Sequence, residues 1–141
     1  MKITICGSIK FAKELVKIYQ ELEKLGHQPM MHPQMFGLAD GTAEQLVDIK
    51  NNVEKSEIKR KYDYIKWWDN CIKSGEAILV CNFDKKEIKN YIGGNSFLEI
   101  GFAYILGKKI FILNSIPEMF YKAEIIGMEP IILDGDLTKV Q

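Results

Sequence analysis

The chain has 141 residues, of which 47% are hydrophobic and 27% charged, and its formal net charge is zero. This length and composition are typical of one globular domain, so we expect a single domain over residues 1–141. The balanced charge argues against a nucleic-acid polymer or a membrane surface as partner, because each attracts a basic excess. No apolar run approaches the roughly 18 residues of a membrane span.

The cysteines and the first residues indicate the compartment. Cys6, Cys71 and Cys81 are odd in number and far apart, which fits neither a disulfide framework nor a CxxC metal site. Their apolar surroundings predict small buried thiols, and we expect a reducing, cytoplasmic location. The opening MKITICGSI predicts a first strand rather than a signal peptide.

The first third of the chain predicts a strand, a glycine turn and a helix. Residues 2–6 are rich in β-branched side chains, and residues 11–25 place apolar residues at helical spacing before Gly26. A helix start above a strand end presents free backbone N–H groups to an anion. The turn of residues 7–10 is therefore either an anion cradle or a plain tight turn in which Ser8 caps the helix.

The next segment predicts a short strand, a loop and a long charged helical region. We expect the strand within residues 27–32, the loop over residues 35–42, and two helices over residues 43–73 with a break between residues 55 and 62. The two histidines of the chain lack a neighbouring ligand cluster, so a surface or loop-packing role is expected for both.

The second half alternates strands and helices. Strands are predicted at residues 77–81, 109–113 and 130–133, with a helix over residues 119–127 before the last strand. The whole pattern predicts one α/β domain with three layers: a parallel sheet of about five strands and helices on both faces.

Polar residues follow the central strand at residues 77–81. Asn82 and Asp84 come directly after it, and ligands of open parallel sheets bind at the carboxyl ends of the strands. We therefore expect both side chains in a substrate site. Asp63 and Asp69 precede the strand, where one acid could reach the rim of a cleft or lie on a solvated helix face.

The stretch YIGGNSFLEIGFAYILG contains one charge, Glu99, in a strongly apolar predicted helix. A buried carboxylate is costly unless it has a partner or a chemical role. Glu99 could be a nucleophile, a base or an acceptor for sugar hydroxyls, or only a charge near a helix start. Apolar walls would raise its pKa and the helix N-terminus would lower it. Gly93, Gly94 and Gly101 would allow a ligand or another backbone to approach closely.

Several motifs resemble the nucleoside 2-deoxyribosyltransferase superfamily, which includes the 2'-deoxynucleoside 5'-monophosphate N-glycosidases. They are CGSI at residues 6–9, the strand end at residues 82–84, and GGNSFLEIGFAYILGKKIFIL at residues 93–113. The resemblance covers essentially the whole chain. It implies a flavodoxin-like, Rossmann-like fold and cleavage or transfer of an N-glycosidic bond of a nucleoside or nucleotide.

The resemblance also implies roles for individual residues. Glu99 would be the nucleophile that forms a glycosyl-enzyme ester, and Asp69 would hold the sugar or assist protonation of the base. Contacts to sugar or phosphate would come from the loops around the site, at Gly7, Ser8, Asn82, Asp84, Gly93, Gly94, Asn95 and Ser96. The phosphate-binding serine of the hydrolases would fall near Gly93, so Ser96 would have to replace it.

No cofactor and no metal are expected, since the chain lacks a ligand cluster. The expected ligand is a small-molecule nucleoside or nucleotide, and the alternative to catalysis is a nucleotide-binding or sensor domain on the same fold. Members of the superfamily assemble as dimers or higher homo-oligomers. Tyr62, Tyr64, Trp67 and Trp68 could form such an interface or could pack within the monomer.

Overall fold

A computed structural model describes all residues, 1–141. It contains five strands, β1 (Lys2–Gly7), β2 (Gln28–Met30), β3 (Ala77–Cys81), β4 (Lys109–Ile112) and β5 (Ile131–Ile132). It contains seven α-helices, α1 (Ala12–Lys24), α2 (Gln34–Asp40), α3 (Gln45–Lys50), α4 (Lys55–Lys61), α5 (Tyr64–Ser74), α6 (Gly94–Ile105) and α7 (Lys122–Gly127). Short 3-10 helices lie at η1 (Ile9–Phe11) and η2 (Leu137–Lys139).

The strands form one parallel sheet in the order β2-β1-β3-β4-β5. This is the flavodoxin-like strand order. Strand β2 is added on one side of β1, and β3, β4 and β5 are added on the other side, so the topological switch point lies between β1 and β3. The predicted α/β class, the parallel sheet of five strands and the three-layer architecture are all confirmed.

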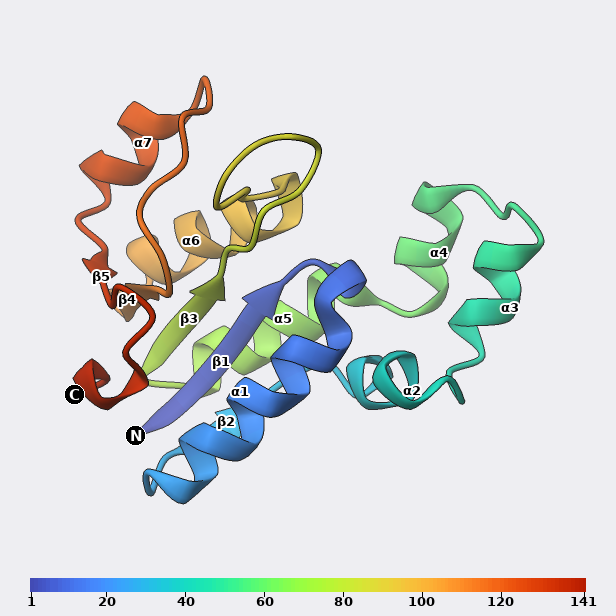
Figure 1. Cartoon of the computed structure of the whole chain (residues 1–141), viewed down its shortest axis with the longest axis horizontal. Helices are drawn as coiled ribbons and strands as arrows, with labels where there is room; N and C mark the ends of the chain where they lie inside the picture. The colour runs from blue at the N-terminus through green and yellow to red at the C-terminus, as the bar shows by residue number, and fades with distance from the viewer.

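Helices cover both faces of the sheet (Figure 1). Helix α1 packs on β1 and β2 at one face, whereas α5 and α6 pack on each other and on the central strands at the opposite face. Helices α3 and α4 lie away from these layers, beyond the carboxyl ends of the strands. They belong to the long segment between β2 and β3, which thus covers the edge where ligands of such folds bind.

Register aligns the ends of the two central strands. Gly7 of β1 pairs with Cys81 of β3, so the turn after Gly7 begins beside the loop that starts at Asn82. Every residue of β3 is buried, as expected for a central parallel strand with helices on both faces. Packing around the glycine is tight, because a Cβ at Gly7 would lie 3.0 Å from a methyl of Leu15 and 3.3 Å from the carbonyl oxygen of Cys81.

The prediction of a loop over residues 35–42 is wrong, because residues 34–40 form α2. Two glycines produced the error. Gly41 has φ +85° and ends the helix in the left-handed conformation that glycine adopts readily. Gly37 lies inside the helix, where a Cβ would come within 3.0 Å of the Ala43 backbone; it permits close packing rather than breaking the helix.

The prediction of two helices over residues 43–73 is also wrong. The segment forms three helices, and the breaks fall at residues 51–54 and 62–63. Asn52 and Asp63 have positive φ values of 55° and 51°, so backbone conformation rather than a proline or glycine ends each helix. Asn and Asp tolerate this left-handed conformation better than most residues, and helical periodicity alone does not reveal it.

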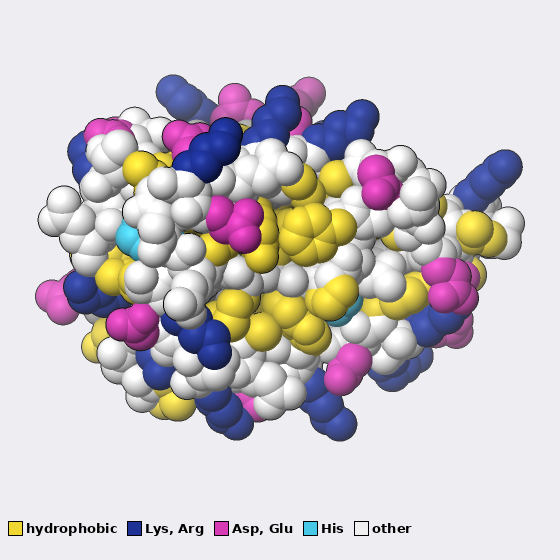
Figure 2. All heavy atoms as spheres, turned by 90° about the horizontal axis from the view of Figure 1, so that it is seen from below, with side chains coloured by type: hydrophobic (Ala, Val, Ile, Leu, Met, Phe, Trp, Pro, Cys, Tyr) yellow, Lys and Arg dark blue, Asp and Glu magenta, His cyan; other side chains and the backbone are white.

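Helix α6 is not buried all round as its composition predicts. Its sheet-facing residues Ile100 and Ala103 are fully buried, but Leu98 is 48% and Ile105 is 81% exposed. Exposed hydrophobic side chains also occur elsewhere: on the face seen in Figure 2 they gather toward the middle, with charged groups mainly around the edge.

Two glycines in helices should respond oppositely to alanine. We expect Gly101→Ala to raise the free energy of unfolding by about 0.5–1 kcal/mol, because a Cβ there meets open space and glycine weakens a helix interior. Gly37→Ala should lower it by about 1–3 kcal/mol through the clash with Ala43. Urea unfolding of both variants checks this pair; equal effects would contradict the packing described.

Candidate active site

A cavity of about 740 Å³ lies at the carboxyl edge of the sheet. It is lined from three directions: by the turn after β1, by the segment from residue 91 to the start of α6, and by α3 to α5. Its lining residues are Gly7, Ser8, Ile9, Phe11, Gln45, Ile49, Asn52, Val53, Glu54, Lys55, Ile58, Lys59, Tyr64, Trp68, Val80, Cys81, Lys85, Tyr91, Gly93, Gly94, Asn95 and Ser96. This volume is within the range of small-molecule sites.

The predicted turn residues form one wall of this cavity. Ser8 caps η1 by accepting a hydrogen bond from the backbone N–H of Lys10, at 3.4 Å. Its hydroxyl also accepts a hydrogen bond of 2.8 Å from the Nζ of Lys85. Ser8 is therefore a cap, as one of the two alternatives for this turn predicts, and it also faces the cavity beside a lysine. Binding of an anion by this turn stays a prediction.

The start of α6 forms a second wall. Gly93 is the N-cap residue and has no side chain that could cap the helix. Four lining residues in a row, 93–96, border the cavity. The loop after β1 and the start of α6 therefore line the same cavity, as predicted. The backbone N–H groups at the N-terminus of α6, a helix of twelve residues, lie at this cavity.

Glu99 lies one turn further along α6 and does not line the large cavity. It borders a separate small cavity of about 10 Å³, together with Asn95, Trp68 and three apolar residues. Asn95 and Trp68 line both cavities, so they separate Glu99 from the larger space. The smaller cavity has room for about one water molecule.

The Glu99 carboxylate is only 3% exposed, and its Oε2 has no hydrogen-bond partner. Burial raises the pKa of Glu99 to about 8, while the thiol of Cys6 and the ammonium of Lys59 act in the opposite direction. The apolar surroundings, which the sequence predicted would raise this pKa, therefore have the largest effect. A buried carboxylate with a perturbed pKa beside a cavity is characteristic of functional sites.

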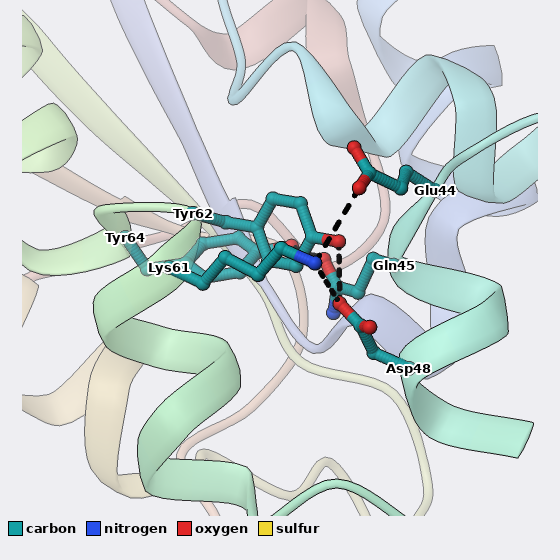
Figure 3. Close-up of polar contacts among 6 residues, drawn as sticks. All are labelled: Glu44, Gln45, Asp48, Lys61, Tyr62 and Tyr64. Carbon is teal, nitrogen blue, oxygen red and sulfur yellow. Dashed lines mark hydrogen bonds and ion pairs between the residues drawn. The ribbon is translucent and has the colours of Figure 1, made fainter. Parts of the chain in front are cut away.

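Polar groups without partners also occur on the α3 and α5 walls. Gln45 is fully buried and its Nε2 has no partner; its Oε1 accepts a hydrogen bond from the hydroxyl of Tyr64 (Figure 3). The indole Nε1 of Trp68 is likewise buried without a partner. Because buried polar groups are normally satisfied, these donors are candidates for ligand contacts. Neither residue was predicted to bind a ligand.

Trp68, Tyr64 and His32 form a stacked aromatic cluster beneath this wall. The His32 ring lies 4.2 Å from that of Tyr64, and its Nε2 is 3.0 Å from the carbonyl oxygen of Tyr62. His32 is therefore a buried packing residue, as predicted for a loop. Tyr64 and Trp68 are each 3% exposed. The prediction that these two form an intermolecular interface is wrong, because they pack within the chain.

Lysines surround the cavity without acidic partners. Lys55, Lys59 and Lys85 line it, and Lys10 and Lys86 are near enough to lower the pKa of Lys85, in addition to the lowering by burial. None of the five lysines takes part in an ion pair. A cavity with unpaired ammonium groups favours an anionic ligand.

Asn82 lies at the predicted strand end, but its side chain has a structural role: it links the loops that follow β3 and β4. Its Nδ2 donates to the carbonyl oxygens of Asn90 and Ser115, at 3.2 and 3.0 Å, and its Oδ1 accepts from the N–H of Asn114, at 2.9 Å. Asp84 accepts a bond of 2.8 Å from the N–H of Asn90. Neither lines the cavity, so the structure does not bring these two predicted residues to it.

The structure also leaves Asp69 away from Glu99. The Asp69 side chain is 42% exposed on α5 and forms an ion pair of 2.8 Å with Lys73, four residues later. It lines neither cavity. Glu76, the other acid before β3, accepts a hydrogen bond from the backbone N–H of Lys2. In this chain Glu99 is thus the buried carboxylate at the site, without the predicted second acid beside it.

Sequence reasoning missed the groups that α3, α4 and α5 supply. Two features of the sequence could have indicated these groups. The 43–73 segment is longer than a crossover between parallel strands needs, and Lys55 and Lys59 have the spacing of residues on one face of a helix. No three His, Cys, Asp or Glu side chains are grouped so that they could hold a metal ion. No helix has the length and apolar character needed to cross a membrane.

Neither the family models nor the curated proteins that were compared with the chain gave a match. Among solved structures, the chain is similar to the CMP N-glycosidase BcmB of Clostridium botulinum, with a TM-score of 0.50 and 16% sequence identity. The similarity covers 94% of this chain and 88% of that protein. At this identity the likeness concerns the fold, which is an α/β fold that a nucleotide N-glycosidase also has.

Proposed function

We propose that this protein cleaves or transfers the N-glycosidic bond of a nucleoside or a nucleoside 5'-monophosphate, with Glu99 as nucleophile. The observation that carries the proposal is the buried Glu99 carboxylate, whose Oε2 has no hydrogen-bond partner. Asn95 and Trp68 lie between it and the large cavity, which is lined by aromatic and cationic side chains. The fold similarity to an N-glycosidase that acts on CMP supports it.

The proposed reaction has two steps. A carboxylate oxygen of Glu99 attacks the anomeric carbon, the C–N bond breaks, and its electron pair leaves with the base, which takes a proton from solvent water. The resulting glycosyl ester is then attacked by water, or by the nitrogen of an acceptor base, which regenerates the Glu99 carboxylate. Since Glu99 is shielded by Asn95 and Trp68, substrate binding must move at least one of them.

The cavity walls fit two parts of such a ligand, the base and an anionic group. The rings of Phe11, Tyr91 and Trp68 can stack on a base. Free donors of Gln45 and Trp68 can reach its carbonyl or ring-nitrogen acceptors. Ser8 and the lysines can hold an anionic group, which supplies what the glycine at position 93 lacks.

The experiment that tests this function is incubation of the purified protein with each nucleoside and nucleoside monophosphate, in ribo and deoxy forms, with and without an acceptor base. Chromatography measures the free base. Release in water alone defines a hydrolase, and release that needs an acceptor defines a transferase. Absence of release from every compound would refute the proposal.

One observation favours a second candidate, a nucleotide-binding domain without turnover: Glu99 is 3% exposed and outside the large cavity. This candidate predicts that a nucleotide raises the melting temperature by mass action while no base is released. Thermal shift and base release on the same samples separate the two candidates.

The proposed active form is a homo-oligomer, and its interface would have to use residues other than Tyr64 and Trp68. Ile65, Leu98 and Ile105 of α5 and α6 are 51%, 48% and 81% exposed, so they are available for it. Light scattering measures the mass in solution, and Leu98→Glu should lower that mass if this surface is the interface.

A further inference from the structure

Helix α4 places a cation beside the buried carboxylate. Lys59 donates a hydrogen bond of 2.7 Å to the Oδ1 of Asn95. Asn95 and Glu99 are four residues apart on α6, so their side chains lie on one face of that helix. Lys59 on α4 therefore contacts Asn95, the residue that lies between Glu99 and the large cavity. Helices α4 and α6 are far apart in the sequence, so only the fold brings this lysine to the glutamate.

The fold holds α4 in this place through a separate set of contacts. Lys61 pairs with Glu44 and Asp48 of the α3 region at 3.4 and 2.9 Å, and the hydroxyl of Tyr62 donates a bond of 2.6 Å to Asp48 (Figure 3). Ile58 is buried in the core. The two sides of α4 thus have different tasks: Lys61 joins α4 to α3, and Lys59 faces α6.

Few charged or titratable groups face Glu99. They are the Cys6 thiol from β1 and Lys59 from α4, and α5 contributes the neutral indole of Trp68. Burial of Cys6, reinforced by Glu99, raises the pKa of this thiol well above its ordinary value, so the thiol stays neutral at physiological pH. Lys59 is therefore the cation available to balance an ionised Glu99.

We propose that Lys59 is a positioning residue for Glu99: bound to Asn95, it supplies a positive charge that favours the ionised, attacking form of the carboxylate against the effect of burial. The proposal rests on the proposed function for its purpose, but the charge coupling itself exists in the free protein. As the Glu99 ester forms, the carboxylate charge disappears, and Lys59 becomes free to interact with an anionic part of the substrate.

The experiment measures the titration of Glu99 by carbon-13 NMR of its carboxyl group, identified by its absence from Glu99→Gln. In Lys59→Met we expect the midpoint to rise by about one pH unit or more, since a nearby cation favours the ionised form. Lys59→Arg should restore it. Lys55→Met is the matched control: it removes a cavity lysine one turn away on the same helix face and should leave the Glu99 midpoint unchanged.

Two results would overturn the proposal: a midpoint in Lys59→Met equal to that of the wild type, or equal rises in Lys59→Met and Lys55→Met. Circular dichroism of each variant checks that it is folded. If the methionine variant does not fold, Lys59→Gln provides the reading, because it also removes the positive charge and should raise the Glu99 midpoint in the same way. Since the titration needs no turnover, failure of base release would refute the proposed function and leave this result standing.

Discussion

Glu99→Gln is expected to make the folded protein more stable than the wild type at neutral pH, by about 3 kcal/mol, while the two are similar near pH 4. The pKa of Glu99 is raised to about 8 in the folded state by burial, from an ordinary value of 4.5. Between these values the unfolded chain loses a proton that the folded protein keeps. The stability of the wild type therefore falls as pH rises, by about 1.4 kcal/mol per pH unit, and glutamine removes this fall.

Urea unfolding at half-unit steps from pH 4 to pH 8.5 measures the effect. The matched control is Glu118→Gln, an exposed glutamate paired with Lys122, which should follow the wild-type curve within about 0.5 kcal/mol. Parallel curves for the wild type and Glu99→Gln would mean that Glu99 titrates normally and is not confined as described.

The same substitution should abolish turnover. Glutamine keeps the shape of Glu99 but has no anionic oxygen to form the glycosyl ester, so we expect base release to fall by at least about a thousandfold, with kcat affected far more than KM. The wild-type kcat/KM should rise with pH toward about 8, because the free protein must ionise Glu99 before attack.

Initial rates of base release between pH 5.5 and pH 9 measure both effects, again with Glu118→Gln as control. Glu99→Gln turning over at a wild-type rate would exclude the nucleophilic mechanism. A wild-type profile that is flat across this range would show that the ionisation of Glu99 does not limit the reaction.

The fold was largely predictable because its signals are local. Apolar runs such as residues 77–81 identify buried strands, and Gly26 marks the end of the first helix, where φ is +87°. The errors fall where long-range packing decides the local conformation. Ala43 packs closely against Gly37 within α2, and Asp63 adopts a left-handed turn between two helices.

The site was predictable only where a residue stands out against its surroundings. Glu99 is the single charge in an apolar helix, and Ser8 follows a strand directly; the structure places both at or beside the cavities. Asn82 occupies the expected strand end, yet its side chain is turned inward by hydrogen bonds to Asn90, Asn114 and Ser115. Lys59 and Gln45 lie in a charged segment that resembles any solvated helix, so only the folded arrangement reveals that they reach the cavity.

The most direct test of Glu99 as nucleophile is to trap the glycosyl ester. A substrate identified by base release is mixed with the protein, quenched in acid within milliseconds to seconds, and digested for peptide mass spectrometry. We predict that the peptide containing Glu99 gains the mass of the sugar, or sugar phosphate, on that residue, and that Glu99→Gln shows no such gain. Rapid base release with an unmodified Glu99 peptide, and undiminished release by Glu99→Gln, would contradict the account.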